Sequence, residues 1–494
     1  MHTAMTEVDV LYATATVHTG WDKVGKDGVI KPAKKVTGGH AFLLVGYDED
    51  GFWLQNSWGT GWGKRGFGHI AYADWLENGM DVWVGRLGAP MRVDARNYVT
   101  GGPTGVVAGV TSMLDLRPHV VAIGNDGKLR QSGIIGNTQD DVEEIFSQHI
   151  PRITKNWSKK RILLYAHGGL VGESGALQRI ENYLPAMLEA GIYPIAFVWK
   201  TDFWTTLKNI LADAFRRRRA EGVLDSTKDF MLDRVDDALE PLARVLSGKM
   251  QWSEMKENAL LSSTAEDGGA ALVAGLLATL AANDSKVELH VAGHSAGSIF
   301  NAPLVQLLAS KGAISGGPMN GRQGLGVAIQ TCTLWAPACT MDLFHETYRP
   351  AVESRQLKNL AIFNLTDQAE RGDHCAHVYN KSLLYLVSNA FENKARIPLI
   401  RDGEPILGMD KFVAKDKALQ KLLGKQYVDY IKAPNQDAEG SQDASKANGH
   451  GDFDDDKATV KATLARILGR KDSKAALSFP RSASSARDMR RRMQ

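Results

Sequence analysis

The clearest chemical signal in the chain is a Gly-x-Ser-x-Gly pentapeptide, residues 293–297, with Ser295 at its centre. An alternating apolar and polar run, residues 287–291, precedes it, and apolar residues at helical spacing follow it. A strand that turns sharply into a helix holds its central serine in a strained conformation, with the hydroxyl above the sheet. The two glycines suit this turn because side chains there would collide with neighbouring backbone. The pattern therefore predicts that Ser295 is the nucleophile of an acyl-transfer reaction.

A second signal lies near the N-terminus, where a histidine begins one predicted strand and an asparagine lies near the end of the next. His40 follows two glycines and opens an apolar run, and Asn56 lies in the run 52–58. The turn-forming residues 48–51 between the two runs predict a hairpin. The carbonyl of Asn56 is then placed to hold the imidazole of His40 in one orientation, with the indole of Trp58 shielding the contact.

Both motifs resemble those of papain-like cysteine peptidases. Gly38-Gly39-His40-Ala41 resembles the histidine motif of that family, and Asn56-Ser57-Trp58-Gly59 followed by Gly61-Trp62-Gly63 resembles its asparagine motif. The resemblance implies the C-terminal, β-rich half of the fold, with His40 as general base and Asn56 as its orienting partner. The nucleophile of the family is a Cys that precedes this half, yet no cysteine precedes Cys332 here.

Three explanations of this incomplete half stay open. It is a fragment of a longer precursor, a half that a Cys-bearing papain-like partner completes, or a degenerate module kept for binding. In each case we expect that the chain alone does not cleave peptides.

The rest of the chain alternates predicted strands with helical patterns. The apolar run 161–166 ends in His167-Gly168-Gly169-Leu170, and such a run fits a strand buried on both faces of a parallel sheet. Residues 200–284 interrupt the alternation with mostly helical sequence. We also expect a hairpin of residues 120–124 and 128–132, further strands at 193–199, 327–335, 360–365 and 427–431, and helices at 138–146, 176–190 and 459–468.

This order of elements resembles the α/β-hydrolase fold of serine esterases and lipases. The resemblance covers residues 118–469, with residues 200–284 where the family often inserts a helical cap. It implies an α/β fold class, with a mostly parallel sheet and a helical cap. The small β-rich half domain that the papain resemblance implies precedes it in the chain. The hydrolase resemblance also implies the chain order Ser, then Asp or Glu, then His for the catalytic groups.

His450 is the candidate base in that order. It lies between two glycines, after the last predicted strand and before the closing helix. His374 and His377 are the competitors, but both precede the final strand. A serine hydroxyl needs such a base before it can attack a carbonyl carbon.

The orienting acid has more than one candidate. Asp367 comes just past the strand 360–365, which places a carboxylate at the carboxyl edge of the sheet. Asp342 follows the preceding strand and is the rival, and a third interpretation has Asp367 only capping a turn. For the oxyanion hole we expect the backbone N–H of Ala296 and a second donor from Gly169 or Leu170.

Composition limits the other function classes. The chain has 494 residues, 44% hydrophobic and 23% charged, which is typical of a globular protein of two or more domains. The net charge is +3, but residues 470–494 contain 8 Lys and Arg and 2 Asp, so the remainder carries −3 and does not indicate nucleic-acid binding. Cys332, Cys339 and Cys375 have neither disulfide-framework nor zinc-site spacing. We therefore expect no metal and a reducing, cytoplasmic location.

The expected organisation has four parts. No signal peptide is expected because Glu7 and Asp9 interrupt the first apolar residues, and the apolar stretch 268–282 is too short to cross a bilayer. The parts are a papain-like half at residues 1–95, a linker at 96–117, a hydrolase domain at 118–469 and a basic, disordered tail at 470–494.

Together the patterns predict a serine hydrolase that carries an incomplete papain-like module. Ser295 attacks a small-molecule ester or acyl substrate, His450 moves the proton and Asp367 orients His450, with no organic cofactor. Two alternatives stay open: a papain-like cysteine peptidase completed by upstream sequence or a partner chain, and a catalytically silent interaction protein.

Overall fold

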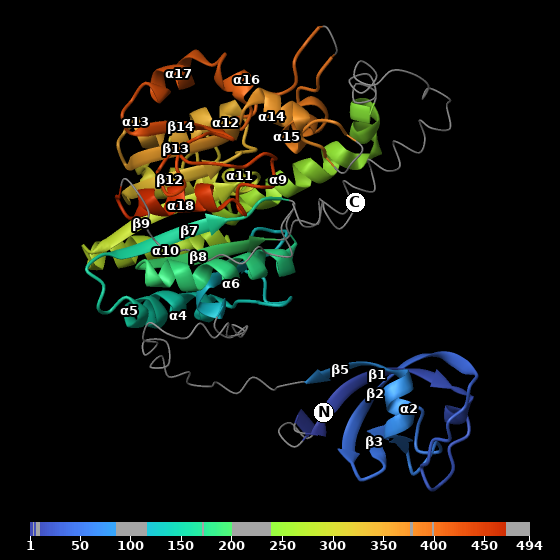
Figure 1. The fold of residues 1–494 in the computed structure, drawn as a ribbon. Helices are drawn as coiled ribbons and strands as arrows, with labels where there is room; N and C mark the ends of the chain where they lie inside the picture. Colours follow the sequence, from blue (N-terminus) through green and yellow to red (C-terminus); the bar gives the residue numbers. More distant parts are fainter. Residues whose placement is uncertain are drawn as a thin grey trace. The chain divides into compact units, whose positions relative to one another are not determined.

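The chain divides into two compact units, residues 1–108 and residues 109–494, and each is described by itself (Figure 1). The boundary between them lies outside the described residues, as do almost all of the expected linker, residues 200–238 of the expected cap and the expected tail beyond residue 470. The computed structural model describes residues 1–2, 4–5, 10–84, 116–169, 172–199, 239–375, 379–397 and 400–470.

The N-terminal unit is built on a five-stranded antiparallel sheet in the order β4-β3-β2-β1-β5. β2 and β3 form the expected hairpin, and β3 ends one residue before Asn56. Trp21 and Trp75 lie in a hydrophobic core that belongs to this unit alone. The elements are β1 (Leu11–His18), η1 (Thr19–Trp21), β2 (Val36–Tyr47), β3 (Gly51–Gln55), β4 (Phe67–Ala71), α2 (Tyr72–Asn78) and β5 (Gly79–Val84).

The second unit is built on a seven-stranded sheet in the order β14-β13-β12-β9-β7-β8-β6, with every neighbouring pair parallel. Its central strands are apolar runs buried on both faces, as parallel sheets between helical layers require. The strands are β6 (Val120–Ile123), β7 (Lys160–Ala166), β8 (Ile192–Trp199), β9 (Val287–His294), β12 (Ile329–Trp335), β13 (Leu357–Leu365) and β14 (Val428–Ala433), and a separate pair is β10 (Lys311–Ala313) with β11 (Gln323–Leu325).

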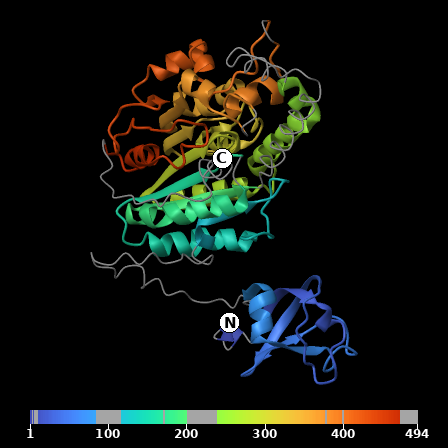
Figure 2. The same cartoon turned by 45° about the vertical axis from the view of Figure 1, so that its right-hand side comes forward.

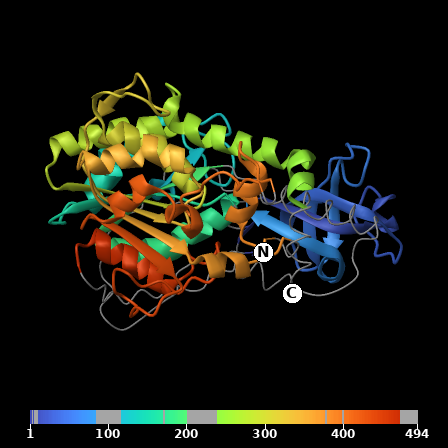
Figure 3. The same ribbon diagram turned by 90° about the horizontal axis from the view of Figure 1, so that it is seen from above.

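Helices cover both faces of the parallel sheet (Figures 2 and 3). α9, α10 and α11 pack together on one face, and α6 and α18 contact the other. The main helices are α4 (Gln139–Glu144), α5 (Ile150–Ile153), α6 (Glu173–Glu189), α9 (Lys249–Thr264), α10 (Gly269–Asn283), α11 (Gly297–Ala309), α12 (Met341–Glu346), α13 (Tyr348–Glu353), α14 (Asp367–Gly372), α15 (Leu383–Leu386), α16 (Asp410–Val413), α17 (Lys417–Leu423) and α18 (Lys457–Ile467). Shorter 3-10 or π segments are η3 (Arg117–His119), η4 (Ile145–His149), η5 (Arg244–Gly248) and η6 (Val387–Phe391).

One expected element differs from the structure. Residues 120–124 and 128–132 form only a minimal hairpin, in which Ile123 bridges Leu129 and the N–H groups of Gly124 and Arg130 donate to the carbonyls of Lys128 and Ala122. The rest of the pairing of β6 is parallel, beside β8 at the edge of the large sheet. All four residues of β6 are buried. A fully buried apolar run is better accommodated in a parallel sheet than in a hairpin with one exposed face.

One helical stretch among the described residues, Lys249–Asn283, is long and apolar enough to cross a bilayer by length and composition alone. In the structure it comprises α9 and α10, which non-helical residues separate. At about 1.5 Å per residue each of the two helices is shorter than the ~30 Å hydrocarbon layer. Trp252 from α9 and Val273 from α10 lie in the core, so the stretch packs as two helices of this unit.

Candidate active site

Ser295 lies on the turn between β9 and α11, at the carboxyl edge of the parallel sheet. Its φ is 51°, a left-handed conformation that is rare and strained for a residue with a side chain. The flanking glycines make the turn possible. A Cβ on Gly293 would lie 2.8 Å from the side-chain nitrogen of Asn301, and one on Gly297 would collide with the carbonyl oxygen of Ala166.

Hydrogen bonds hold the backbone of this turn. The N–H of Ser295 donates to the carbonyl of Trp335 at 2.9 Å, and its own carbonyl accepts from the N–H of Ala338 at 3.0 Å. The hydroxyl of Ser298 donates to the same carbonyl at 2.7 Å. Ala336 follows the end of β12 and lies between Trp335 and Ala338, and it also has a positive φ, 40°. Strain at both strand ends is therefore offset by a dense set of backbone hydrogen bonds.

His450 meets Ser295 across 155 residues of sequence. Its Nε2 lies 2.8 Å from the Oγ of Ser295, and both side chains are buried. His450 belongs to the loop before α18, where the glycines on either side leave the backbone little restrained by local structure. The structure thus brings together the predicted nucleophile and the predicted base.

Asp367 is not the carboxylate that the structure places at His450. Its Oδ1 accepts from the hydroxyl of Tyr385 at 2.5 Å, and its Oδ2 accepts from the Nε of Arg371 at 2.8 Å. Asp373 is placed there instead: its Oδ2 accepts from the backbone N–H of His450 at 2.8 Å. The physical reason is that α14 begins at Asp367 and carries the chain on to Asp373.

The remaining histidines and acids of the prediction lie elsewhere. Asp342, the rival acid, is exposed at the start of α12 and has Lys394 at 3.8 Å. The backbone N–H of His374 donates to the Oδ1 of Asp373 at 2.9 Å, and the side chain of His374 is exposed. His377 lies outside the described residues.

A buried carboxyl group, that of Glu370, lies on α14, the short helix that begins at Asp367. Glu370 is 1% exposed, accepts a hydrogen bond from the hydroxyl of Ser382, and sits between Asp367 and Asp373 in sequence. Burial, with the nearby carboxylates of Asp373 and Asp367, raises the pKa of Glu370 to about 8. Glu370 is therefore protonated near neutral pH, which limits the negative charge beside the His450 loop.

The loop expected to form the oxyanion hole lies against Ser295 and Ala296. A Cβ on Gly168 would lie 3.3 Å from the Cβ of Ser295, and one on Gly169 would lie 3.3 Å from the Cβ of Ala296. Ala296 directly precedes α11, so its N–H lies at a helix N-terminus, where partial positive charge favours an anion. Leu170 lies outside the described residues. Met255 of α9 packs against the loop: its sulfur would lie 2.9 Å from a Cβ on Gly169.

His167 fixes the start of this loop. Its Nδ1 donates to the carbonyl of Gly168 at 2.9 Å, and its Nε2 accepts from the backbone N–H of Trp199 at 3.3 Å. Burial lowers the pKa of His167 to about 4, so the ring is neutral at physiological pH. A neutral ring with one donor and one acceptor satisfies both contacts, which makes His167 a structural residue of the loop.

The N-terminal unit contains the other predicted pair. His40 Nε2 lies 2.8 Å from the Oδ1 of Asn56, and the rings of His40 and Trp58 have centroids 4.6 Å apart. Trp58 is 44% exposed, His40 is half-buried and Asn56 is buried, so the His40 ring is only partly covered at the surface of its unit. The structure therefore also brings together the predicted general base and its orienting amide.

The three cysteines all lie in the second unit and are buried. Burial raises the pKa of Cys332, and burial raises that of Cys339 to about 12. Such thiols stay protonated and are poor nucleophiles. Among the residues that the structure describes, no group of three or more His, Cys, Asp or Glu side chains is arranged to hold a metal ion.

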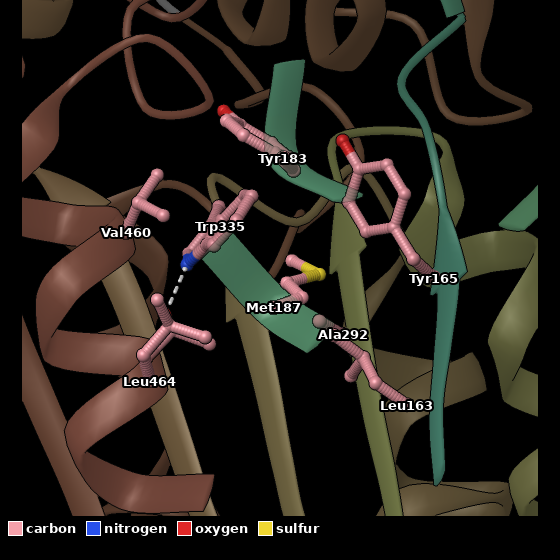
Figure 4. Close-up of a pocket in the computed structure, with 9 residues that line it drawn as sticks. Leu163, Tyr165, Tyr183, Met187, Ala292, Trp335, Val460 and Leu464 are labelled. Carbon is pink, nitrogen blue, oxygen red and sulfur yellow. Dashed lines mark hydrogen bonds between the residues drawn. The ribbon is translucent and has the colours of Figure 1, made fainter. Parts of the chain in front are cut away.

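An apolar cavity lies between α6 and α18, on one face of the sheet (Figure 4). The hydroxyls of Tyr165 and Tyr183 point toward the same end of it, and the indole of Trp335 donates to Thr463 at 3.1 Å. The lining is completed by Leu163, Met187, Ala292, Val460 and Leu464. Because Ser295 and His450 are not among the lining residues, this cavity is separate from the candidate site.

Comparison with known proteins finds a family similarity for the N-terminal unit. Residues 5–81 match the family model described as papain family cysteine protease. The matched segment includes His40 and Asn56, so the N-terminal unit is similar to that family. No curated protein matches the chain.

Proposed function

We propose that the second unit is a serine hydrolase of the α/β-hydrolase type that hydrolyses small ester or acyl substrates. The observation that carries the proposal is the 2.8 Å contact of Ser295 Oγ with His450 Nε2, made from a strained strand-to-helix turn. A parallel sheet with the serine at its carboxyl edge and a later histidine supports the same assignment. The chain supplies a group for each step of acyl transfer without a cofactor.

The contacts suggest the following cycle. His450 accepts the proton of Ser295 as Oγ attacks the carbonyl carbon, and the resulting oxyanion is stabilised by the N–H of Ala296 and a donor of the Gly168-Gly169 loop. Collapse of the tetrahedral intermediate breaks the ester bond, and His450 gives its proton to the leaving alkoxide. Water then attacks the acyl-enzyme with His450 again as base, which releases the acid and restores Ser295.

Asp373 takes the place of the acid in this proposal. Its carboxylate is buried and accepts from the backbone N–H of the residue whose ring becomes positively charged during the reaction. Asp367 is instead assigned to the contacts with Tyr385 and Arg371.

The proposal is tested by hydrolysis of p-nitrophenyl acetate. Ser295→Ala should lower the rate by about 10³-fold or more, because the nucleophile is lost. Ser298→Ala is the matched control: it removes a hydroxyl from the same turn that supports the Ser295 carbonyl, and should retain at least about a tenth of the activity. Wild-type turnover in Ser295→Ala would overturn the proposal.

A second function is supported by the N-terminal unit. The His40–Asn56 contact of 2.8 Å and the match to the papain family suggest half of a cysteine peptidase, which needs a thiol from upstream sequence or a partner. The purified chain should therefore cleave no general peptide substrate. Cleavage that a thiol-alkylating inhibitor blocks and that His40→Ala abolishes would show that the chain is a peptidase by itself.

A further inference from the structure

A second histidine directly precedes the nucleophile. His294 is the last residue of β9, is 4% exposed, and its Nε2 lies 2.9 Å from the carbonyl oxygen of His450. A carbonyl can only accept, so Nε2 of His294 carries the hydrogen. The rings of the two histidines have centroids 5.6 Å apart, so His294 lies beside His450.

The other ring nitrogen of His294 faces a buried carboxylate. Its Nδ1 lies 3.8 Å from the Oδ2 of Asp454. The guanidinium of Arg179, on α6, donates to the backbone carbonyl of Asp454 at 2.8 Å and lies 3.4 Å from the carboxylate of Asp454. Burial acts to raise the pKa of Asp454, but Arg179 and His294 outweigh it and lower the pKa to about 2. The Nδ1 side of the His294 ring therefore faces a charged group that α6 holds in place, at a distance longer than a hydrogen bond.

The backbone of His450 is consequently held from both sides. Its N–H donates to Asp373, which follows α14, and its carbonyl accepts from His294, at the end of β9. Gly449 and Gly451 give the loop itself little conformational preference. The contacts from neighbouring elements must therefore set where the ring of His450 lies.

We propose that His294 is a positioning residue, which fixes the His450 loop to the same turn that carries Ser295. The proposal rests on the proposed serine-hydrolase function. Because His294 and Ser295 are consecutive, any movement of the nucleophile turn also moves the anchor of the base. The Nε2–H of His294 is the group that makes this connection.

Two substitutions separate this role from simple packing. His294→Gln places an amide N–H close to the position of Nε2 and should keep kcat for p-nitrophenyl acetate within about 3-fold of wild type. His294→Phe fills the ring volume without a donor and should lower kcat by about 10- to 100-fold, since small displacements of a catalytic group are costly. KM should change by less than about 3-fold in both, because His294 does not touch substrate. Equal loss in Gln and Phe would overturn the proposal.

An experiment that does not depend on activity completes the test. Amide hydrogen exchange of the segment 446–456 should accelerate in His294→Phe and not in His294→Gln. The segment 160–166 of β7 is the control and should be unchanged. If Phe also loosens β7, His294→Leu, which is smaller and equally without a donor, replaces it in both assays.

The outcomes distinguish the two claims. Unchanged exchange of 446–456 in the variant without a donor would overturn the positioning role, whatever the activity. Faster exchange of that segment in a protein whose hydrolysis does not depend on Ser295 would leave the positioning contact intact and overturn the proposed function.

Discussion

Each of the two units contains a histidine with a polar partner 2.8 Å away, but the partners differ in kind. His40 contacts the amide of Asn56, which can orient a ring and cannot be acylated. His450 contacts the hydroxyl of Ser295, which becomes a nucleophile when it gives up its proton. The comparison teaches that an oriented imidazole is only half of a covalent catalyst.

The surroundings differ in the same sense. His450 is buried and its backbone is held by Asp373 and His294, whereas His40 is half-buried beside the exposed ring of Trp58. A dry, preorganised setting strengthens electrostatic stabilisation of a transition state. The surroundings of His450 therefore suit the proposed acyl transfer, whereas the sequence of the first unit contains no cysteine that could act with His40.

The largest expected effect comes from the base of the second unit. His450→Ala should lower p-nitrophenyl acetate hydrolysis by about 10³-fold or more, because it removes the group that contacts the Oγ of Ser295 and is proposed to take its proton. His374→Ala removes the exposed competitor and should stay within about 3-fold of wild type. If His374→Ala causes the larger loss, the base has been assigned to the wrong histidine.

The acid should give the next largest effect. The two carboxylate oxygens of Asp373 accept hydrogen bonds from two backbone N–H groups. Asp373→Asn leaves only one side-chain oxygen to accept them, so we expect a loss of about 10²-fold in kcat. Asp367→Asn should cost less than about 3-fold, because that side chain is partly exposed and contacts Tyr385 and Arg371. A larger loss in Asp367→Asn would return the role to the acid that the sequence suggested.

Glu370 should make the stability of the second unit depend on pH. Because burial raises its folded pKa to about 8 from 4.5, the folded state keeps a proton that the unfolded chain loses. The free energy of unfolding should therefore fall as pH rises from 4.5 to about 8, by up to about 1.4 kcal/mol per pH unit, and then level off.

Glu370→Gln should remove that component of the pH dependence. Urea unfolding of the wild type and the variant at several pH values across this range measures it, and comparing the two cancels the contribution of other groups. Identical pH dependence would show that Glu370 does not carry a raised pKa in the folded protein.

The smallest expected effect belongs to the N-terminal unit. His40→Ala should change the hydrolysis of p-nitrophenyl acetate by less than about 2-fold, because its contacts are to Asn56 and aromatic rings of its own unit. A large loss of ester hydrolysis in His40→Ala, in a protein with unchanged thermal unfolding, would contradict the separation of the two sites.

The sequence was sufficient where the signal was local. The glycines around Ser295 report the strained turn directly, and the paired motifs of His40 and Asn56 lie on one hairpin. His450 could be proposed from the sequence because it lies between two glycines, before the last helix. The apolar runs likewise indicated the buried strands of a parallel sheet.

Contacts made between distant segments were missed. Asp373 lies past the short helix that begins at Asp367, and the course of that helix decides which acid contacts His450. His294 acts on a backbone carbonyl 156 residues away, and no local pattern reports such a contact. The sequence predicts strand β6 and its turn, but not its parallel pairing with β8, which lies far along the chain.

The central claim, that Ser295 is an activated nucleophile, is tested most directly by mapping a fluorophosphonate adduct. The account predicts a single covalent adduct on the peptide that contains Ser295, formed by the wild type and by His40→Ala, and much slower in His450→Ala. Peptide mass spectrometry after digestion locates the modified residue. The absence of an adduct from a folded protein, or its attachment to another residue, would contradict the account.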